Sequence, residues 1–240
     1  MRHTNTRARK SRPAPASGQQ RSAAAAQPRH GYHHGELRAA LIAATEAILA
    51  ERGVDGFTLR EAARRAGVSP AAPSHHFGDA AGLLTAVAKL GFDGLAEALR
   101  AGATAAGREP LARLRGLGIG YVRFALANRA RFLLMFRRAV LRPDDPMLAA
   151  ANAAYRELED AIRVLRGCAP DEGLDERGHA SLIAYWSVVH GFAHLALDGQ
   201  FERAATDGLE AFVARVLPPV LEQLRAPEPA AGGTGAPAQR

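Results

Sequence analysis

The sequence lacks features that several classes of protein require. Cys168 is the only cysteine among the 240 residues, so neither an intrachain disulfide nor a zinc site built from several thiolates can form. Aromatic residues make up only 6% of the chain, and its most apolar stretch, residues 117–141, is interrupted by five arginines. So many charges exclude a bilayer span there, and no apolar segment follows the basic N-terminus as in a secretion signal. We therefore expect a cytoplasmic protein.

Acidic residues are absent from the first 30 residues, which hold seven lysines and arginines. The remaining 24 basic and 24 acidic side chains cancel, so this segment accounts for the whole net charge of +7. It is rich in Ala, Pro, Ser and Gln and has almost no large apolar residues, which predicts a disordered basic arm over residues 1–30. The arm either adds sequence-independent affinity for DNA phosphates, or it is a solvated tail or a misassigned start without a role.

Catalytic signatures are missing as well. The sequence has no glycine-rich phosphate loop after a strand, no nucleophile elbow and no pair of carboxylates in an apolar setting. His190 and His194 are four residues apart, but Gly191 stands where a zinc peptidase has its glutamate, and no third ligand is evident. We therefore expect a protein that is not an enzyme and that uses no cofactor or metal.

Helical periodicity is present almost throughout, without convincing strand alternation, so the expected fold class is all-α. Start and stop signals, such as Pro110 at a helix start and the Arg142–Pro146 break, divide the chain into nine helices. These are expected over residues 37–52, 59–66, 70–77, 79–105, 110–127, 129–138, 147–166, 174–197 and 206–224. A Pro-, Ala- and Gly-rich tail at 226–240 is expected to be mobile.

Two short helices between residues 58 and 77 form the most informative pattern. Thr58 and Glu61 have the spacing of a capping box, in which the hydroxyl accepts one free helix N–H and the carboxylate reaches back to another. Gly67 can take the left-handed conformation that ends a helix, and Val68 then fills the angle between the two helices. Two helices joined by so tight a turn predict a helix-turn-helix DNA-binding motif.

The second motif helix is expected to begin with Ser69 as its N-cap and Pro70 at its first position. Pro73 would then occupy the fourth position and remove the first internal hydrogen bond. The helix before the motif is expected to cover its buried side and to complete a three-helix head over residues 35–78. Its apolar stripe consists of Leu37, Leu41, Ala44 and Ile48.

With these residues in place, the chain resembles the tetracycline-repressor (TetR) family of bacterial transcription regulators. Residues 53–58, 62–69 and 75–79 have the order and spacing of that family's N-terminal head. Residues 121–136 and Trp186–Phe192 resemble one subgroup of its C-terminal domains, named after a Trp-His-Gly (WHG) signature. The resemblance implies a three-helix helix-turn-helix head followed by a six-helix ligand-binding and dimerisation domain.

The head departs from the family pattern at two places. Ser74 stands where the family usually has a tyrosine that touches a DNA phosphate, and Ala80-Ala81 stands where a lysine and an acidic residue are common. One or two phosphate contacts of the family are therefore not expected to carry over to this chain.

DNA contacts are expected at the start and on the outer face of the second motif helix, with help from the first. Arg60 is the best candidate for a bidentate guanine contact, and a small side chain such as Ala71 can contact a thymine methyl. Thr58 and Ser69 cap their helices and would touch only phosphate. Of the two adjacent histidines, one is expected to be packed in the core, because neighbours on a helix point about 100° apart. The candidates are Thr58, Arg60, Ser69, Pro70, Ala71, Ser74, His75 and His76.

The resemblance also implies an effector pocket between the head and the dimer face. Aromatic and apolar side chains at helical spacing would form its walls, and a histidine would supply a polar group. The candidates are Tyr121, Phe124, Phe132, Met135, Phe136, Tyr155, Trp186 and His190. The alternative is that these side chains are plain hydrophobic core.

In the family, the last two long helices pair with their copies in a second subunit as a four-helix bundle. Both expected helices have apolar faces broad enough for the subunit core and a partner, although the faces could also pack within one chain. They consist of Leu182, Ile183, Trp186, Val189, His190, Ala193 and Leu197, and of Leu209, Phe212, Val213, Val216, Leu217, Val220 and Leu224. A two-fold dimer would read a roughly palindromic operator.

Together these features predict a sequence-specific DNA-binding transcriptional regulator: a homodimeric repressor that releases its double-stranded DNA operator when an unknown small-molecule effector binds. The expected domains are the basic arm at 1–30, a helix-turn-helix DNA-binding domain at 31–95, a ligand-binding and dimerisation domain at 96–225 and the tail at 226–240. The alternative is an α-helical adaptor or membrane-surface protein that uses the basic arm to bind acidic lipids.

Overall fold

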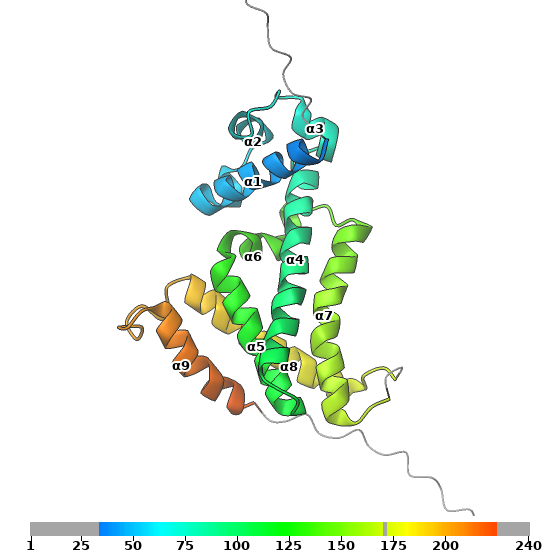
Figure 1. Cartoon of the computed structure of the whole chain (residues 1–240), viewed down its shortest axis with the longest axis vertical. Helices are drawn as coiled ribbons and strands as arrows, with labels where there is room; N and C mark the ends of the chain where they lie inside the picture. The colour runs from blue at the N-terminus through cyan, green and yellow to red at the C-terminus, as the bar shows by residue number, and fades with distance from the viewer. Residues whose placement is uncertain (1–33, 170–171, 225–240) are drawn as a thin grey trace, which may run out of the picture. The chain divides into compact units, whose positions relative to one another are not determined.

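A computed structural model of the chain describes residues 34–169 and 172–224, and within these ranges every regular element is a helix (Figure 1). The all-α prediction is confirmed. The expected basic arm at 1–30 and the expected tail at 226–240 lie outside the described residues. Residues 34–169 and 172–224 contain nine α-helices: α1 His34–Arg52, α2 Leu59–Arg65, α3 Ala72–Phe77, α4 Ala80–Ala105, α5 Pro110–Ala127, α6 Arg129–Met135, α7 Asp145–Arg166, α8 Glu176–Leu197 and α9 Leu209–Glu222. The same residues contain two short 3₁₀ helices, η1 Val54–Gly56 and η2 Arg138–Val140.

Local signals fix most of the helix ends. Asp79 caps α4 by accepting a hydrogen bond from the Gly82 N–H, and Asp144 caps α7 through the Met147 N–H. α5 has the bounds expected from Pro110 at its first position. The expected helix at 129–138 divides into α6 and η2, and α9 begins three residues later than expected, after Gly208 in a positive-φ conformation.

The buried side chains form two clusters. The smaller one comprises Leu41, Ile48, Ala62, Phe77 and Leu83 from α1 to α4. The larger one begins at the very next residue of α4, Leu84, takes in Leu49 from α1, and extends through α5 to α9. We call residues 34–83 the head and residues 84–224 the body. Because α4 supplies side chains to both clusters, a displacement of α4 in the body would also move the α4 side chain that packs in the head.

The contact between α4 and α5 depends on three glycines. A Cβ atom on Gly102 would meet the Gly116 carbonyl, and one on Gly116 would meet the Gly102 carbonyl. A Cβ atom on Gly120 would likewise meet the carbonyl of Ala98. Only glycine lets the two backbones approach so closely, and the approach holds α4 rigidly against the body.

A long apolar helix, α8, lies outside the 117–141 stretch. By length and composition it is the one described helix that could cross a membrane, with a mean hydropathy of 1.3 over 18 residues. A single such helix is not an indication of a membrane protein, and α8 contributes Leu182, Val189 and Ala193 to the body core. Its outward face still carries exposed apolar side chains, among them Ile183 and Leu195.

Candidate nucleic-acid interface and ligand cavity

The first helix of the motif, α2, forms one of the two hydrogen bonds of the expected capping box. The Thr58 hydroxyl accepts a hydrogen bond from the Glu61 N–H at 3.2 Å. The reciprocal half of the predicted capping box is wrong, because the Glu61 carboxylate instead accepts hydrogen bonds from Arg64 and Arg65 at 2.8 Å. Two arginines one turn along the helix compete successfully with a single backbone N–H, since charge-assisted hydrogen bonds are the stronger ones.

These ion pairs change the charge that α2 presents. Arg65 also binds the Glu51 carboxylate of α1 at 2.6 and 2.8 Å. The two guanidinium groups lower the pKa of Glu61 to about 2. Arg64 and Arg65 are therefore compensated by carboxylates, whereas Arg60 is exposed and forms no ion pair with any residue in 34–169 or 172–224. Arg60 is the cation of α2 that is left to meet a nucleic acid.

The turn of the motif forms as predicted, but the second helix starts later. Gly67 adopts a left-handed φ of 68°, and Val68 packs against the head cluster. The prediction that Ser69 caps the helix at Pro70 is wrong, because α3 begins at Ala72 and has no side-chain cap. The physical reason is Pro73: it has no N–H to donate to the Ser69 carbonyl, so the Ala72 N–H closes a shorter turn onto that carbonyl at 3.0 Å.

The residues nominated for DNA contact nevertheless share one property, which is exposure. Thr58, Arg60, Ser69, Pro70, Ala71, Ser74 and His75 are all exposed. His76 is half-buried, with its ring 5.4 Å from that of His75, and Phe77 and Pro73 are buried beneath them. The Arg38 guanidinium lies over the Phe77 ring at 4.5 Å. The start of α3 thus offers small and polar side chains on a surface supported by the head core.

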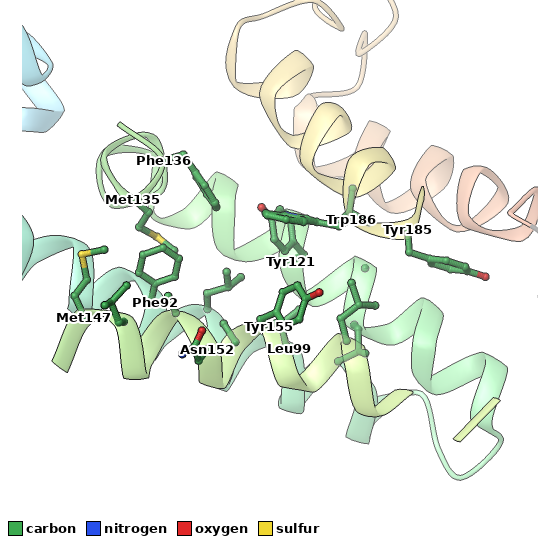
Figure 2. A pocket seen from close by; sticks show the side chains of 18 of the residues that line it. Phe92, Leu99, Tyr121, Met135, Phe136, Met147, Asn152, Tyr155, Tyr185 and Trp186 are labelled. Atoms are coloured by element: carbon green, nitrogen blue, oxygen red, sulfur yellow. The ribbon is translucent and has the colours of Figure 1, made fainter. Parts of the chain in front are cut away.

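The body holds a cavity of about 400 Å³ lined by α4 to α8. Figure 2 shows Phe92, Met135 and Met147 toward one end, Tyr185 toward the other, and Tyr121, Tyr155 and Trp186 between them. The wall consists of Phe92, Leu95, Leu99, Leu114, Leu117, Gly118, Tyr121, Met135, Phe136, Arg138, Leu141, Pro143, Met147, Leu148, Ala151, Asn152, Ala154, Tyr155, Leu158, Tyr185, Trp186 and Val189. Its size lies within the usual range for small-molecule sites.

Five of the nominated pocket residues line this cavity: Tyr121, Met135, Phe136, Tyr155 and Trp186. The other three, Phe124, Phe132 and His190, do not line it. Phe132 is fully buried and sits among aromatic rings, with its centroid 5.6 Å from that of Tyr121 and 5.3 Å from that of Phe136. Phe124 is buried against Gly94 of α4.

His190 acts behind the cavity wall. The Tyr121 hydroxyl and His190 Nδ1 are 2.7 Å apart, so a hydrogen bond fixes the tyrosine that lines the cavity. Burial raises the pKa of Tyr121, and burial together with His194 lowers the pKa of His190. Both groups are thus uncharged at neutral pH. In the described part of the chain no three His, Cys, Asp or Glu side chains come together as a metal site.

Sequence reasoning missed the wall contributed by α4 and, except for Tyr155, the wall contributed by α7. Phe92, Leu95 and Leu99 of α4 look like ordinary core positions, and only the tertiary structure leaves space beside them. In α7 a signal was available: Leu148, Ala151, Tyr155 and Leu158 recur at three- and four-residue spacing on a helix whose other faces are charged. At the rim, Leu148, Tyr155 and Trp186 remain about 40% exposed, which is unusual for large apolar side chains.

The segment between α6 and α7 connects the cavity with the head. It supplies Phe136, Arg138, Leu141 and Pro143 to the cavity wall. Its arginines reach the head: Arg142 binds Asp79, the N-cap of α4, at 2.6 Å, and Arg137 binds Asp55 of η1 at 3.2 Å.

Two further contacts strengthen this connection. Arg131 of α6 binds Glu46 of α1. The buried Thr85 hydroxyl of α4 donates to the Arg142 carbonyl and accepts from the Arg142 N–H, at 3.2 and 3.0 Å. One segment therefore touches both the cavity and the start of α4.

Comparisons with known proteins agree with this arrangement. Residues 41–87 match the family model described as bacterial regulatory proteins, tetR family, and residues 114–218 match the model described as tetracyclin repressor-like, C-terminal domain. Among proteins of curated function, none matches the chain.

Solved structures match over nearly their whole lengths. A protein from Rhodococcus sp. RHA1, described as of unknown function, shares 33% identity with a TM-score of 0.65, and the match covers 81% of this chain and 98% of that one. The TetR family regulator PfmR from Thermus thermophilus shares 20% identity with a TM-score of 0.56, over 79% and 96% of the two chains. A regulatory protein in the tetR family from Rhodococcus RHA1 shares 20% identity with a TM-score of 0.57, over 82% and 99%. At 20% identity, these last two show the fold alone.

The head matches the N-terminal model of the family, and the body matches its C-terminal model. The geometry of α2 and α3 in the head is that of a helix-turn-helix motif. The chain belongs to the TetR family and is a DNA-binding transcriptional regulator.

Proposed function

We propose that the protein is a homodimeric repressor that binds a palindromic operator and leaves it when a small apolar molecule occupies the body cavity. The observation that carries the proposal is the segment between α6 and α7, which lines the cavity and binds Asp79 and Asp55 of the head. A ligand that displaces this segment also displaces the N-terminus of α4. Operator release then follows if the ligand binds the displaced state more tightly.

The head would read DNA with α3 and the exposed end of α2. In this proposal Arg60 contacts guanine, while Pro70, Ala71, Ser74 and His75 meet base edges at the start of α3. Thr58, Ser69 and the half-buried His76 contact phosphate. The exposure of these side chains and the ion pairs that occupy Arg64 and Arg65 support the assignment.

Dimerisation is assigned to the outward faces of α8 and α9. The inward members of the nominated faces, such as Leu182, Val189, Phe212 and Leu217, are buried in the subunit. On α8, Ile183 and Trp186 are exposed, and so are the uncharged Ala184 and Ser187. An uncharged patch of this kind on α8 suits a four-helix bundle in which α8 and α9 pack against their copies in a second subunit.

The remaining assignments follow from this function. We place the protein in the cytoplasm, where an operator is accessible, and keep the domain limits of 31–95 and 96–225, although the two buried clusters meet at residues 83 and 84. Trp186, His190 and Gly191 support the WHG subgroup for the C-terminal domain. The adaptor alternative rests only on the basic arm at 1–30.

Selection of bound sequences from random duplex DNA tests the proposal. The purified full-length protein at about physiological salt is expected to enrich a palindrome, and a variant with Arg60→Ala and His75→Ala should enrich it weakly or with relaxed sequence. Arg64→Ala serves as the control, because Arg64 is already paired with Glu61. DNA binding that is independent of sequence and steeply dependent on salt would contradict the proposal and favour the adaptor alternative.

A further inference from the structure

We infer that the cavity accepts an elongated apolar molecule with one anionic head group, and that Arg138 binds this group. The inference rests on the proposed function, since it names the ligand class of the same cavity. Three features of the described residues carry it: the shape of the cavity, the charges of its wall and the absence of a partner for Arg138.

The cavity is long rather than round. Its wall on α7 runs from Met147 to Leu158, which corresponds to roughly 16 Å along the helix at 1.5 Å per residue. In Figure 2 the labelled side chains follow α7 from Met147 to beyond Tyr155, with Tyr185 at the far end. A volume of about 400 Å³ drawn out over that length suits a chain-like molecule better than a fused ring system.

The wall is selective in charge. Apart from Arg138, the described residues that line the cavity are apolar or aromatic, with Asn152 and three tyrosines as the polar groups. None of them is a carboxylate. A cationic ligand would lose its hydration without gaining a counter-charge, and such burial of an unpaired ion is costly. The hydrocarbon chain of a ligand can be buried against apolar side chains along the whole length of the wall.

Arg138 differs from the arginines of α6 and from the other arginines of the segment that follows α6. Arg131, Arg137 and Arg142 bind Glu46, Asp55 and Asp79, and Arg129 donates to the Leu197 carbonyl. For Arg138, by contrast, the described parts of the chain provide no ion pair, and it is the member of this set that lines the cavity.

The position of Arg138 also suits a head group. It begins η2, between the lining residues Phe136 and Leu141, and its side chain is exposed. A carboxylate bound there would remain close to solvent, where an ion costs little to accommodate, while the chain extends inward past Phe92 and Tyr121. Because Arg137 and Arg142 on either side hold the head, the head group would act on the segment that joins cavity and head.

The test uses Trp186, the only tryptophan of the chain, which lines the cavity and reports binding without DNA. Fluorescence titrations of the full chain with dodecanoate, dodecanol and dodecylamine compare one chain length with three head groups. We expect dodecanoate to bind at least about tenfold more tightly than dodecylamine, which corresponds to about 1.4 kcal/mol. Equal or tighter binding of the amine, or no binding of dodecanoate, would overturn the inference.

The variant Arg138→Gln localises the head group. It should weaken dodecanoate binding by about fivefold to tenfold, since the pair is partly exposed to water, and leave dodecanol binding unchanged. Arg156→Gln, on an exposed position of α7 outside the cavity wall, is the matched control and should change neither. An unchanged preference for carboxylate over alcohol in Arg138→Gln would contradict the role of Arg138.

DNA binding by the same preparations separates this inference from the proposed function. Carboxylate-selective binding in a protein that enriches no operator would leave the ligand class standing and reject the repressor. Operator binding without carboxylate selectivity would reject the ligand class and leave the repressor standing.

Discussion

The head and the body of this chain use their interiors differently. The head buries five side chains in its own cluster, while its exposed surface carries a network of Glu51, Glu61, Arg64 and Arg65. The larger cluster has 33 buried side chains, 32 from the body and Leu49 from the head, yet the body keeps a cavity of about 400 Å³ among them. The larger core can tolerate an unfilled space that would cost the head a large part of its stability. In the proposed function, DNA binds to an outer surface of the head and the ligand binds in an internal space of the body.

Truncation of the head core has the largest expected effect. Leu41 is fully buried, and Leu41→Ala should cost about 3 kcal/mol because the small cluster leaves a cavity when it loses a side chain. Operator binding, measured by fluorescence anisotropy, should be lost, whereas ligand-induced changes in Trp186 fluorescence should persist. The control Val164→Ala, at an exposed position on α7, should affect neither. Simultaneous loss of both signals would show that head and body do not differ in this way.

Removal of Arg60 should act on the outer surface alone. We expect Arg60→Ala to weaken binding to the selected operator by about 1–3 kcal/mol without changing the melting temperature, because Arg60 has no ion pair within the described residues. Arg64→Ala should have a smaller effect on the affinity, since Glu61 already compensates its charge. The order of the two operator affinities decides the prediction; a larger loss for Arg64→Ala would refute it.

The connection between the two regions is tested by Arg142→Gln. This change removes the ion pair with Asp79, which is exposed and therefore contributes little to the stability of the fold. Operator affinity without ligand should change little, but the factor by which ligand weakens operator binding should shrink by about twofold to fivefold. Arg156→Gln should leave that factor intact. An unaltered factor in Arg142→Gln would assign the coupling to other contacts.

Acid should weaken the two regions over different pH ranges. Burial lowers the pKa of His190 below 6.5, so the unfolded chain binds this proton more readily and the body loses stability as the pH falls from about 6.5. The pKa of Glu61 is lowered from 4.5 to about 2, so its stabilising ion pairs persist down to about pH 4.5 and are lost between there and pH 2.

Melting temperatures recorded from pH 8 to pH 3 check this small effect. His190→Gln should remove the decline below pH 6.5 and keep the one below pH 4.5. Glu61→Gln should keep the first decline and only reduce the second, because the pKa values of Glu51, Asp79, Glu109 and Asp207 are lowered as well. A decline below pH 6.5 that survives in His190→Gln would assign it to another group.

Much of the fold could be predicted because its signals are local. Pro110 fixes the start of α5, Thr58 caps α2, and Gly67 ends the first motif helix, each through groups within four residues. The start of α3 was misjudged because two prolines compete: Pro70 favours a helix start, whereas Pro73 removes the hydrogen bond that such a start would need.

The functional sites could be predicted only in part, because many of their contacts join residues that are far apart in the sequence. Arg65 pairs with Glu51, 14 residues away, and Arg142 with Asp79, 63 residues away, and no sequence periodicity indicates either. The cavity is space left between α4 to α8, so aromatic spacing identifies Tyr121 and Trp186 but cannot distinguish them from Phe132, which is buried in the core. The contrast between Arg138 and its paired neighbours likewise exists only in three dimensions.

Reciprocal linkage between the two sites tests the central claim most directly. Operator affinity would be measured by anisotropy at increasing dodecanoate concentration, and dodecanoate affinity by Trp186 fluorescence with and without saturating operator. If the cavity controls the head, each ligand should weaken the other by the same factor, at least about fivefold. Simultaneous binding with unchanged affinities would contradict the account, because the cavity and the DNA surface would then be independent.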